Sequence, residues 1–247
     1  MSQTISASLL TTYKDQYAGG ASAWRDSSAR QKAVNILSLF RSNQTRDIQE
    51  LLDVGSGDGA VLAALRSTGY TGHLTSLEIS ESGAEAIRAR NIPGLREVRL
   101  FDGYRIPFAD RQFPLATCSH VIEHVEHPRM LLREIARVSE YQILEIPIDF
   151  SFFVDKHVDR FLAYGHINIY TPALFKFLLK SEGFEVLDEQ FSFFSPEILR
   201  QIYPNLWKRT IVSAKIAVLK SIPFLRKIKP SAYTVLCRHS GQTIAIM

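Results

Sequence analysis

Three glycines stand at alternate positions directly after a short apolar run. The run is Leu51–Val54, with the acidic Asp53 near its end, and the glycines are Gly55, Gly57 and Gly59. Glycine allows a tight turn and lets a ligand approach the backbone where a Cβ would clash. The residues after the turn have helical apolar spacing, and the start of such a helix offers free N–H groups to a ligand. The pattern predicts a nucleotide-binding strand–turn–helix unit.

Three further apolar runs also end in polar or glycine residues. The first carries Glu78, nineteen residues after Gly59; the others end at Asp102-Gly103 and Ser119-His120. Ligands of open α/β sheets bind at the carboxyl edge of the strands, and an acid at the end of the second strand can bind both ribose hydroxyls of an adenosine. These residues therefore predict a nucleotide site at one sheet edge.

Alternating strands and helices must position these residues. Period-2 and buried apolar runs predict strands near 50–54, 73–79, 97–101, 115–118, 142–146, 184–191 and 233–239. Amphipathic spacing predicts helices near 28–40, 59–67, 81–90, 128–139 and 172–183. This alternation is typical of an α/β fold with a largely parallel sheet.

The ordered set of motifs resembles the class I S-adenosylmethionine-dependent methyltransferases. It is most similar to the methyltransferase type 11 domain, the small-molecule type that includes quinone-biosynthesis methyltransferases. The motifs that carry the resemblance are the glycine turn with Asp53, then Glu78, Phe101-Asp102-Gly103, Pro107-Phe108 and Ser119–Val125. The resemblance is strongest over residues 48–147. It implies a Rossmann-like seven-stranded sheet of order 3-2-1-4-5-7-6 with the last strand antiparallel, helices on both faces, and S-adenosylmethionine as cofactor.

The resemblance also implies which residues bind the cofactor. Glu78 would bind the ribose hydroxyls, and Asp102 the adenine amino group, with Asp110 as a nearby rival. Asp53 would anchor the loop or the methionine ammonium. The full expected set is Asp53, Gly55, Ser56, Gly57, Gly59, Glu78, Ile79, Phe101, Asp102, Gly103, Ser119 and His120.

His120 and the residues after it allow two interpretations. The spacing His120-x-x-Glu123-His124 fits one class of zinc peptidase. That motif needs a sustained helix with both histidines on one face, whereas this segment directly follows a strand. We therefore expect no metal ion here and a structural role for His124. His120 is a candidate general base, because histidine exchanges a proton near neutral pH, or else a wall of the substrate or cofactor site.

Segments outside the core motifs divide the chain, which we expect to be a single methyltransferase domain over residues 1–247. Residues 1–47 would form an N-terminal lid and helix, and residues 148–170 an insertion on the acceptor side. Residues 195–230 would form an insertion between the last two strands, because the gap is far too long for a hairpin turn. Candidate lid residues over the acceptor are Tyr17, His157, Tyr164 and His166.

Charge is strongly segregated along the chain. The net charge is +4, yet residues 198–247 hold nine basic side chains and no acidic one. A basic, Trp-containing segment at 205–229 could touch an anionic membrane surface peripherally, although a packing helix is the simpler interpretation. No stacking platform or reading motif for nucleic acid is present, so we expect no nucleic-acid partner.

Composition is ordinary for a globular protein, with 46% hydrophobic and 22% charged residues. Cys118 and Cys237 lie in predicted strands and are expected to be buried free thiols. No signal peptide or membrane span is evident, which favours a cytoplasmic protein that could contact a membrane peripherally.

The expected function is thus methyl transfer from S-adenosylmethionine to a small-molecule acceptor, with anionic and lipid-linked acceptors included. One alternative is a non-catalytic S-adenosylmethionine-binding scaffold. Another is an NAD-dependent oxidoreductase, because Gly55-x-Gly57-x-x-Ala60 also fits the dinucleotide fingerprint.

Overall fold

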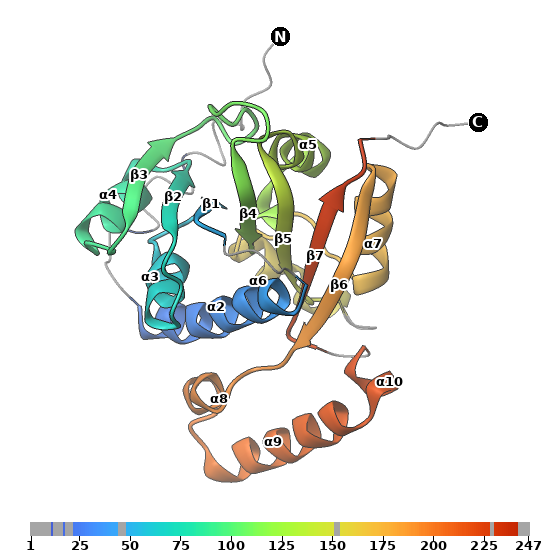
Figure 1. The fold of residues 1–247 in the computed structure, drawn as a ribbon. Helices are drawn as coiled ribbons and strands as arrows, with labels where there is room; N and C mark the ends of the chain where they lie inside the picture. The colour runs from blue at the N-terminus through green and yellow to red at the C-terminus, as the bar shows by residue number, and fades with distance from the viewer. Residues whose placement is uncertain are drawn as a thin grey trace.

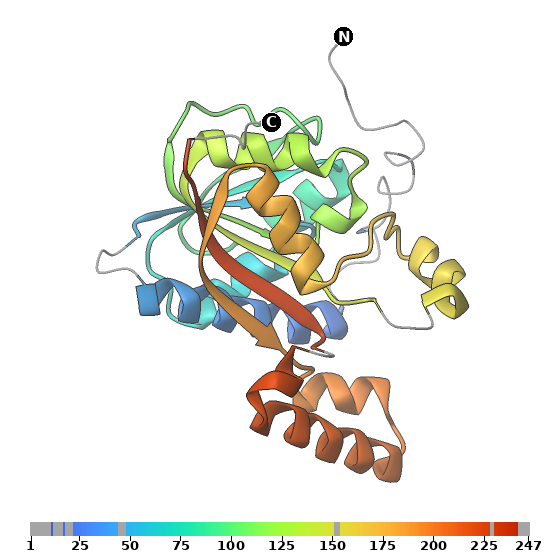
Figure 2. The same ribbon diagram turned by 90° about the vertical axis from the view of Figure 1, so that its right-hand side faces the viewer.

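The described residues form one twisted sheet flanked by helices, with a separate helical lobe at one end (Figures 1 and 2). The structure is a computed structural model, and it describes residues 11, 17, 22–43, 48–150, 154–227 and 230–241 of the 247-residue chain. Of the expected lid at 1–20, only residues 11 and 17 are described; the rest of that segment lies outside the described residues.

Seven strands build the sheet in the predicted order. The strands are β1 (Glu50–Val54), β2 (His73–Glu78), β3 (Leu95–Leu100), β4 (Phe113–Ser119), β5 (Ser139–Pro147), β6 (Phe184–Ser192) and β7 (Ala232–His239). Their order is β3-β2-β1-β4-β5-β7-β6, which confirms the sequence prediction. The first five run parallel, and β7 pairs antiparallel with both β5 and β6. The carboxyl ends of β1, β2, β3 and β4 consequently meet at one edge.

Helices cover both faces and create two cores. Side chains of α2 (Ala23–Asn43), α3 (Ala60–Ser67) and α4 (Glu81–Ala89) pack in the core on one face. Side chains of α5 (Pro128–Val138) and α7 (Pro172–Ser181) pack in the core on the other. Central strands contribute to both cores, which is why they are continuous apolar runs rather than alternating ones.

Local sequence signals set several helix ends. The Thr171 side chain accepts a hydrogen bond from the Leu174 N–H and caps α7, as expected from the sequence. Pro128 stands in the first turn of α5, where a missing N–H costs nothing. Cys118 and Cys237 are buried and free, and burial raises the pKa of both thiols.

The N-terminal helix α2 is fixed to the far side of the sheet by one buried side chain. Asn35 donates to Glu145 Oε2 on β5 at 3.1 Å and to Ser192 Oγ on β6 at 2.7 Å. Its carbonyl oxygen accepts from the Gln190 side chain at 3.0 Å. A buried amide whose donors and acceptor all have partners aligns the elements that it joins.

Between β6 and β7 the chain forms the lobe seen at the bottom of Figure 1. It consists of α8 (Pro196–Ile202), α9 (Leu206–Ser221) and α10 (Pro223–Arg226). α8 has two buried residues, Ile198 and Leu199, whereas no residue of α9 is buried. α9 is therefore only partly a packing helix. One apolar stripe of it is half-buried, namely Val212, Ile216 and Leu219.

Between β5 and α7, the insertion carries the short helices η2 (Val154–His157) and α6 (Val158–Ala163). Figure 2 shows α6 projecting from the body of the molecule. The remaining short element is η1 (Ile122–His124), which follows β4 directly.

Asn35→Ala should lower the free energy of unfolding by about 2–3 kcal/mol, because the buried groups that Asn35 bonds lose their partner. Urea denaturation followed by circular dichroism measures the change. Ser38→Ala removes an exposed hydroxyl from the same helix and should change the value by less than about 0.5 kcal/mol. Equal stability of the two variants would contradict the role given to Asn35.

Candidate active site

The glycine turn after β1 has the backbone conformation that only glycine adopts freely. Gly55, Gly57 and Gly59 all have positive φ, at 75°, 59° and 76°. A Cβ on Gly55 would collide with the Val121 side chain, and one on Gly57 would lie 3.0 Å from the Tyr17 hydroxyl. The turn is tied to β2, because the Gly55 N–H donates to the Leu77 carbonyl at 2.9 Å.

Glu78 lies at the end of β2 with its carboxylate against this turn. Its Oε2 accepts from the Gly57 N–H at 2.8 Å, and its Oε1 accepts from the Ser80 N–H at 3.1 Å. Burial raises the pKa of Glu78, opposed by these backbone hydrogen bonds. Oε1 also accepts from the Ser80 hydroxyl at 3.2 Å, whereas Oε2 has a second lone pair, so Glu78 can hold the turn and also accept from a ligand hydroxyl.

Asp53 is buried one strand away and supports the same turn. Its Oδ1 accepts from the Thr117 hydroxyl on β4 at 2.7 Å. Burial raises the pKa of Asp53, against the hydrogen bond from Thr117. Ser56 turns inward, and its hydroxyl donates to the Asp53 carbonyl at 3.0 Å. These contacts join β1, the turn and β4 into one rigid edge.

The ends of β3 and β4 complete this edge. Asp102 Oδ1 accepts from the backbone N–H groups of Tyr104 and Arg105, at 2.9 and 2.6 Å, and so shapes the loop that includes Gly103. The rival Asp110 is 77% exposed at its side chain and pairs with Arg137, away from this edge. At the end of β4, Ser119 Oγ is buried with no hydrogen-bond partner among the described residues.

Two apolar residues of the expected cofactor set, Ile79 and Phe101, are half-buried at the ends of β2 and β3. Both pack against the core that contains α5 and α7. Their backbone positions follow from the strand register, because the Phe101 N–H donates to the Glu78 carbonyl at 3.1 Å.

An ion-pair cluster that the sequence analysis missed clamps α2 onto the glycine turn. Asp58, inside the turn, pairs with Arg90 at 2.9 Å and Arg25 at 3.3 Å, and Arg90 also pairs with Asp26. Arg90 further donates to the Asp58 carbonyl. The sequence signal that could have revealed the cluster is Asp58 itself, an acid between two glycines of the motif. Its negative charge needs basic partners from elsewhere in the chain.

His120 is held in a strained conformation beside a buried carboxylate. Its φ is +57°, which a non-glycine residue rarely adopts. The His120 N–H donates to the Glu145 carbonyl at 2.9 Å, and His120 Nε2 lies 3.3 Å from Glu145 Oε1. Strain of this kind, held in place by surrounding contacts, is concentrated at functional sites.

Glu145 on β5 fixes that histidine and was also missed. Its Oε2 accepts from Thr234 Oγ1 on β7 at 2.6 Å and from Asn35. Burial by itself would raise the pKa of Glu145, but the hydrogen bond and charge of His120, with Lys32 and Thr234, lower it to about 2. An acid inside the apolar run Ile143–Pro147 was the sequence signal that could have revealed it.

A cavity of about 790 Å³ opens beside His120 and Glu145. Its walls come from α2, the end of β5, the insertion after β5, and the segment that links β6 to α8. Its lining combines apolar and polar side chains, which is typical of a small-molecule site. The apolar ones include Trp24, Phe193 and Phe194, and the polar ones Lys32, His120 and His166.

The four candidate lid residues have different positions. Tyr164 and His166 line the cavity, whereas His157 is exposed and is not part of its wall. Tyr17 lies over the glycine turn, with the Arg25 guanidinium 5.1 Å from its ring centre. Tyr164 and His166 therefore border this cavity, and Tyr17 borders the glycine turn.

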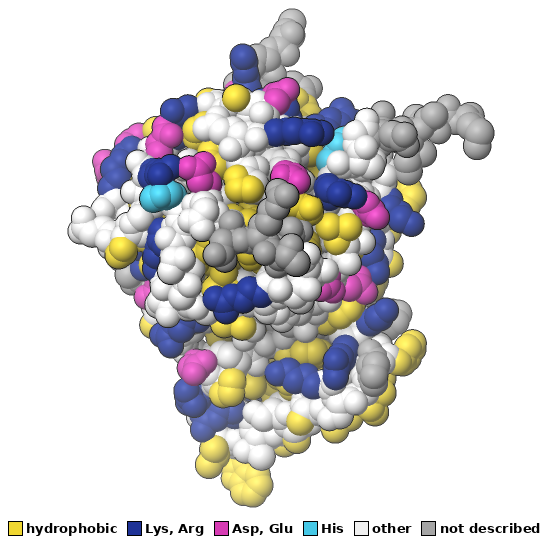
Figure 3. Space-filling model, viewed as in Figure 1, with side chains coloured by type: hydrophobic (Ala, Val, Ile, Leu, Met, Phe, Trp, Pro, Cys, Tyr) yellow, Lys and Arg dark blue, Asp and Glu magenta, His cyan; other side chains and the backbone are white. Residues whose placement is uncertain are grey.

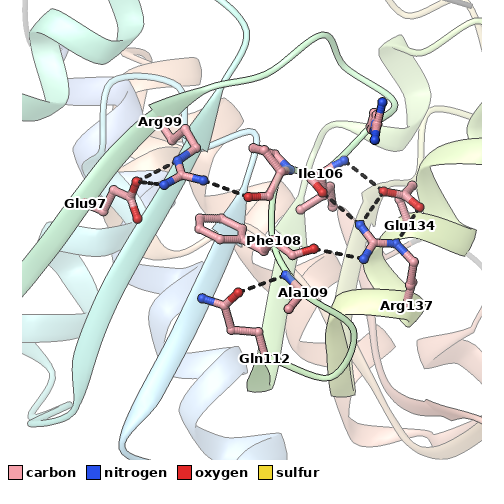
Figure 4. A pocket seen from close by; sticks show the side chains of 10 residues that line it. Glu97, Arg99, Ile106, Phe108, Ala109, Gln112, Glu134 and Arg137 are labelled. Atoms are coloured by element: carbon pink, nitrogen blue, oxygen red, sulfur yellow. Dashed lines mark hydrogen bonds and ion pairs between the residues drawn. The ribbon is translucent and has the colours of Figure 1, made fainter. Parts of the chain in front are cut away.

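A second cavity, of about 530 Å³, lies between β3, the loop after it and α5 (Figure 4). Its charged groups satisfy one another: Arg137 binds Glu134 and the Phe108 carbonyl, and Arg99 binds Glu97 and the Pro107 carbonyl. This network holds the loop of residues 105–112 against the sheet, which is a structural role.

Comparisons with known proteins agree with the geometry. Residues 52–140 match the family described as "Methyltransferase domain". The chain is 31% identical to YrhH of Bacillus subtilis over 44% of this chain and 61% of that protein, less than two thirds of its length. It is 28% identical to the demethylmenaquinone methyltransferase of Thermotoga maritima over 59% of this chain and 74% of that one.

Among solved structures, a chain from the Haloferax volcanii complex of the Trm112 methyltransferase activator with a methyltransferase has a TM-score of 0.64. It is 15% identical and covers 91% of this chain, with 96% of its own length matched. At that identity the likeness shows the fold alone.

The described residues form a Rossmann-like α/β fold with the glycine turn and the expected site residues at the carboxyl edge of β1–β4. The family match over residues 52–140 and the methyltransferase relatives make this chain similar to the class I S-adenosylmethionine-dependent methyltransferases, whose cofactor is S-adenosylmethionine. The residues present fit that cofactor, because the glycines leave room at the turn, Glu78 retains acceptor capacity and Ser119 Oγ has no hydrogen-bond partner among the described residues. The oxidoreductase interpretation gains no support from these matches.

Glu78→Ala should weaken S-adenosylhomocysteine binding by about 30- to 150-fold, because a charged acceptor for two hydroxyls is worth about 2–3 kcal/mol. Isothermal titration calorimetry measures the affinity. Asp110→Ala, which removes an exposed acid far from the edge, should stay within about twofold of the wild type. Unchanged affinity in a folded Glu78→Ala variant would rule out the ribose-binding role.

Proposed function

We propose that this protein transfers the methyl group of S-adenosylmethionine to a small-molecule or lipid-linked acceptor bound in the cavity beside His120. One observation carries the proposal: His120 follows the end of β4, at the edge where Glu78 and the glycine turn lie, and it also lines the cavity. When bound, the cofactor supplies a methyl group already activated by its sulfonium. The protein's remaining tasks are alignment and exclusion of water.

His120 would remove the acceptor's proton, and Glu145 would support it. Glu145 is ionised, since its pKa is about 2, so it stabilises the imidazolium that forms when His120 takes a proton. The restraints on Glu145 from Asn35 and Thr234 keep the imidazole in one orientation. The reaction would form a bond from the acceptor atom to the methyl carbon as the carbon–sulfur bond breaks, with the acceptor's proton left on His120.

The cavity favours an acceptor that is partly aromatic and carries a polar or anionic group. Trp24, Phe193 and Phe194 offer apolar surface, while Lys32 supplies positive charge. The similarity to a protein named as a demethylmenaquinone methyltransferase supports a quinol-like ring as the first class to test.

A scaffold that binds the cofactor without turnover is the second candidate. Its support is the part of the protruding lobe formed by α9 and α10, whose described residues do not line the cavity. Release of S-adenosylhomocysteine in a panel of hydroxylated aromatic and quinol acceptors separates the two, because a scaffold would bind cofactor and release no product.

His120→Gln should lower kcat by about 10²- to 10⁴-fold with an accepted substrate, the range that general-base catalysis supplies. Affinity for S-adenosylhomocysteine should stay within about threefold. The assay follows S-adenosylhomocysteine release, and His157→Ala, an exposed histidine outside the cavity, is the matched control. A His120→Gln variant with wild-type kcat would leave His120 as a wall of the site and remove the base from the proposal.

The helical lobe gives a reason to include lipid-linked acceptors. The stripe of α9 opposite its half-buried side is strongly exposed: Trp207 is 80%, Ile211 67% and Val218 55% accessible. Phe224 of α10 is 74% accessible. Basic side chains surround this stripe, and Figure 3 shows them mixed with hydrophobic ones over the lobe.

Apolar and basic side chains on one helix suit an anionic membrane surface, where aromatic residues insert and lysines meet headgroups. We therefore include peripheral contact through residues 205–229 in the proposal. In the described part of the chain no helix is both long and apolar enough to cross a bilayer.

Neutralising Lys208, Arg209, Lys215 and Lys220 together should reduce binding to vesicles with anionic lipid at least tenfold at low salt, because each charge contributes about 1 kcal/mol near such a surface. Co-sedimentation with vesicles of 30% phosphatidylserine measures binding. Cofactor affinity should stay within about twofold.

Two controls define the membrane test. The Arg88→Gln/Arg96→Gln variant removes exposed charges from the main body and should bind vesicles almost as the wild type does. Trp207→Ser/Ile211→Ser should weaken binding without a change of charge. A wild-type protein that ignores anionic vesicles at low salt would remove the membrane contact from the proposal.

A further inference from the structure

Three potential metal ligands that the sequence separates lie together next to the acceptor cavity. Glu123 and His124 belong to η1, directly after β4, and His166 belongs to the insertion after β5. One ligand atom from each lies within 4.8 Å of the other two. His166 also lines the cavity that holds His120.

Glu123 is the unusual member of this cluster. The residue is 1% exposed, and neither of its carboxylate oxygens has a hydrogen-bond partner among the described residues. The nearest nitrogens, His124 Nε2 and His120 Nδ1, lie 3.7 and 3.8 Å from Glu123 Oε1. A buried carboxylate without hydrogen bonds is costly unless a positive charge meets it. The carboxylate therefore requires a cation or a proton at this point.

The two histidines are oriented as metal ligands usually are. His124 Nδ1 lies 2.9 Å from the Gly165 carbonyl, and His166 Nδ1 lies 2.5 Å from Asp149 Oδ2. When each ring is neutral, its Nδ1–H can donate the hydrogen bond to this oxygen, and the lone pair for a metal ion is then on Nε2. Ligating histidines donate their other N–H to a carbonyl or carboxylate in the same way, which fixes the tautomer and raises ligand basicity.

Backbone contacts hold the two segments together independently of any ion. The N–H groups of Ile167 and Asn168 both donate to the Glu123 carbonyl at 3.0 Å. The Asn168 side chain donates to the Val125 carbonyl at 2.8 Å. The cluster is thus assembled by main-chain hydrogen bonds, so its three side chains are brought together before any ligand arrives.

We propose that Glu123, His124 and His166 bind a divalent first-row transition-metal ion, with Zn²⁺ as the test ion. Two imidazoles and one carboxylate are the donor set of open, catalytic-type sites, which keep a position for water or substrate. This proposal replaces the sequence-based expectation of no metal. The peptidase pattern itself is not formed, because His120 and His124 do not share a sustained helix and the third ligand comes from His166.

An ion at this place would border the acceptor cavity. A Lewis acid there polarises an oxygen donor and lowers the pKa of a hydroxyl. Acceptors with a hydroxyl or an anionic oxygen would then be preferred; this consequence rests on the proposed function, whereas metal binding itself does not.

The competing explanation is a proton. Burial opposes protonation of His166, but its hydrogen bond to Asp149 and the charge of Glu123 raise its pKa, so a protonated His166 could balance Glu123. Burial lowers the pKa of His124, which favours its neutral, ligating form. The two explanations predict different responses to Zn²⁺ and to loss of the carboxylate charge.

The test uses the full-length protein, stripped with a chelator and titrated with Zn²⁺ by calorimetry and by thermal melting. The metal site predicts one Zn²⁺ per chain with a submicromolar Kd and a melting temperature that rises with Zn²⁺, because the ion binds only the folded state. Glu123→Gln and His166→Ala should weaken binding at least 100-fold. Asp149→Asn, which alters only the partner of His166, should weaken it about 10- to 100-fold.

His157→Ala is the control, since it removes a histidine from the same insertion but outside the cluster. Folding is checked by S-adenosylhomocysteine affinity, which does not depend on the acceptor or on turnover. The proposal is overturned if the wild-type protein has no one-to-one Zn²⁺ site with a Kd below about 100 μM. It is also overturned if the Glu123→Gln and His166→Ala variants bind Zn²⁺ as tightly as the wild type does. If Glu123→Gln fails to fold, His166→Ala and Asp149→Asn decide, because both change partly exposed side chains.

Discussion

The hydrogen bonds of Glu145 are the interaction on which the rest of the site depends. A carboxylate buried between β5, β7 and α2 needs compensating groups, and here Thr234 and Asn35 donate to Oε2, while His120 Nε2 lies 3.3 Å from Oε1. The same contacts dock the N-terminal helix, align the antiparallel β7 and hold His120 in its left-handed conformation. The buried carboxylate of Glu145 thus links the pairing of β5 and β7 to the position of His120 at the acceptor cavity.

A second set of buried acids organises the cofactor edge. Asp53, Asp58 and Glu78 surround the glycine turn, and each is met by donors from a different element. Because the turn contains three glycines, these carboxylates supply the rigidity that its glycines lack. Arg25 and Arg90 extend this support to α2, so the N-terminal segment is part of the site rather than an appendage.

The two insertions distinguish this chain from the bare fold. The one after β5 brings His166 and Tyr164 to the cavity, and the one between β6 and β7 closes the cavity with Ile198 and carries the exposed α9. Both belong to the β5–β7–β6 half of the sheet, whereas the glycine turn and Glu78 lie at β1 and β2. Such a division lets one part of the molecule bind a common cofactor while another part selects the acceptor.

The sequence alone determined the positions of the strands, the glycine turn and the polar residues at the strand ends, because period, glycine spacing and strand-end polarity are local signals. The strand order followed only from the resemblance to a known family. The sequence did not reveal the roles of Glu145, Asn35 and Asp58, and it could not place His166 beside Glu123. These residues meet partners that are far away in the sequence; Asn35 and Ser192, for example, are 157 positions apart. The sequence also could not decide which stripe of α9 faces water, because both stripes are apolar. Only tertiary packing decides which buried charges meet which partners. The free-energy cost of burying a charge is offset only when two elements pack together and bring a donor to it.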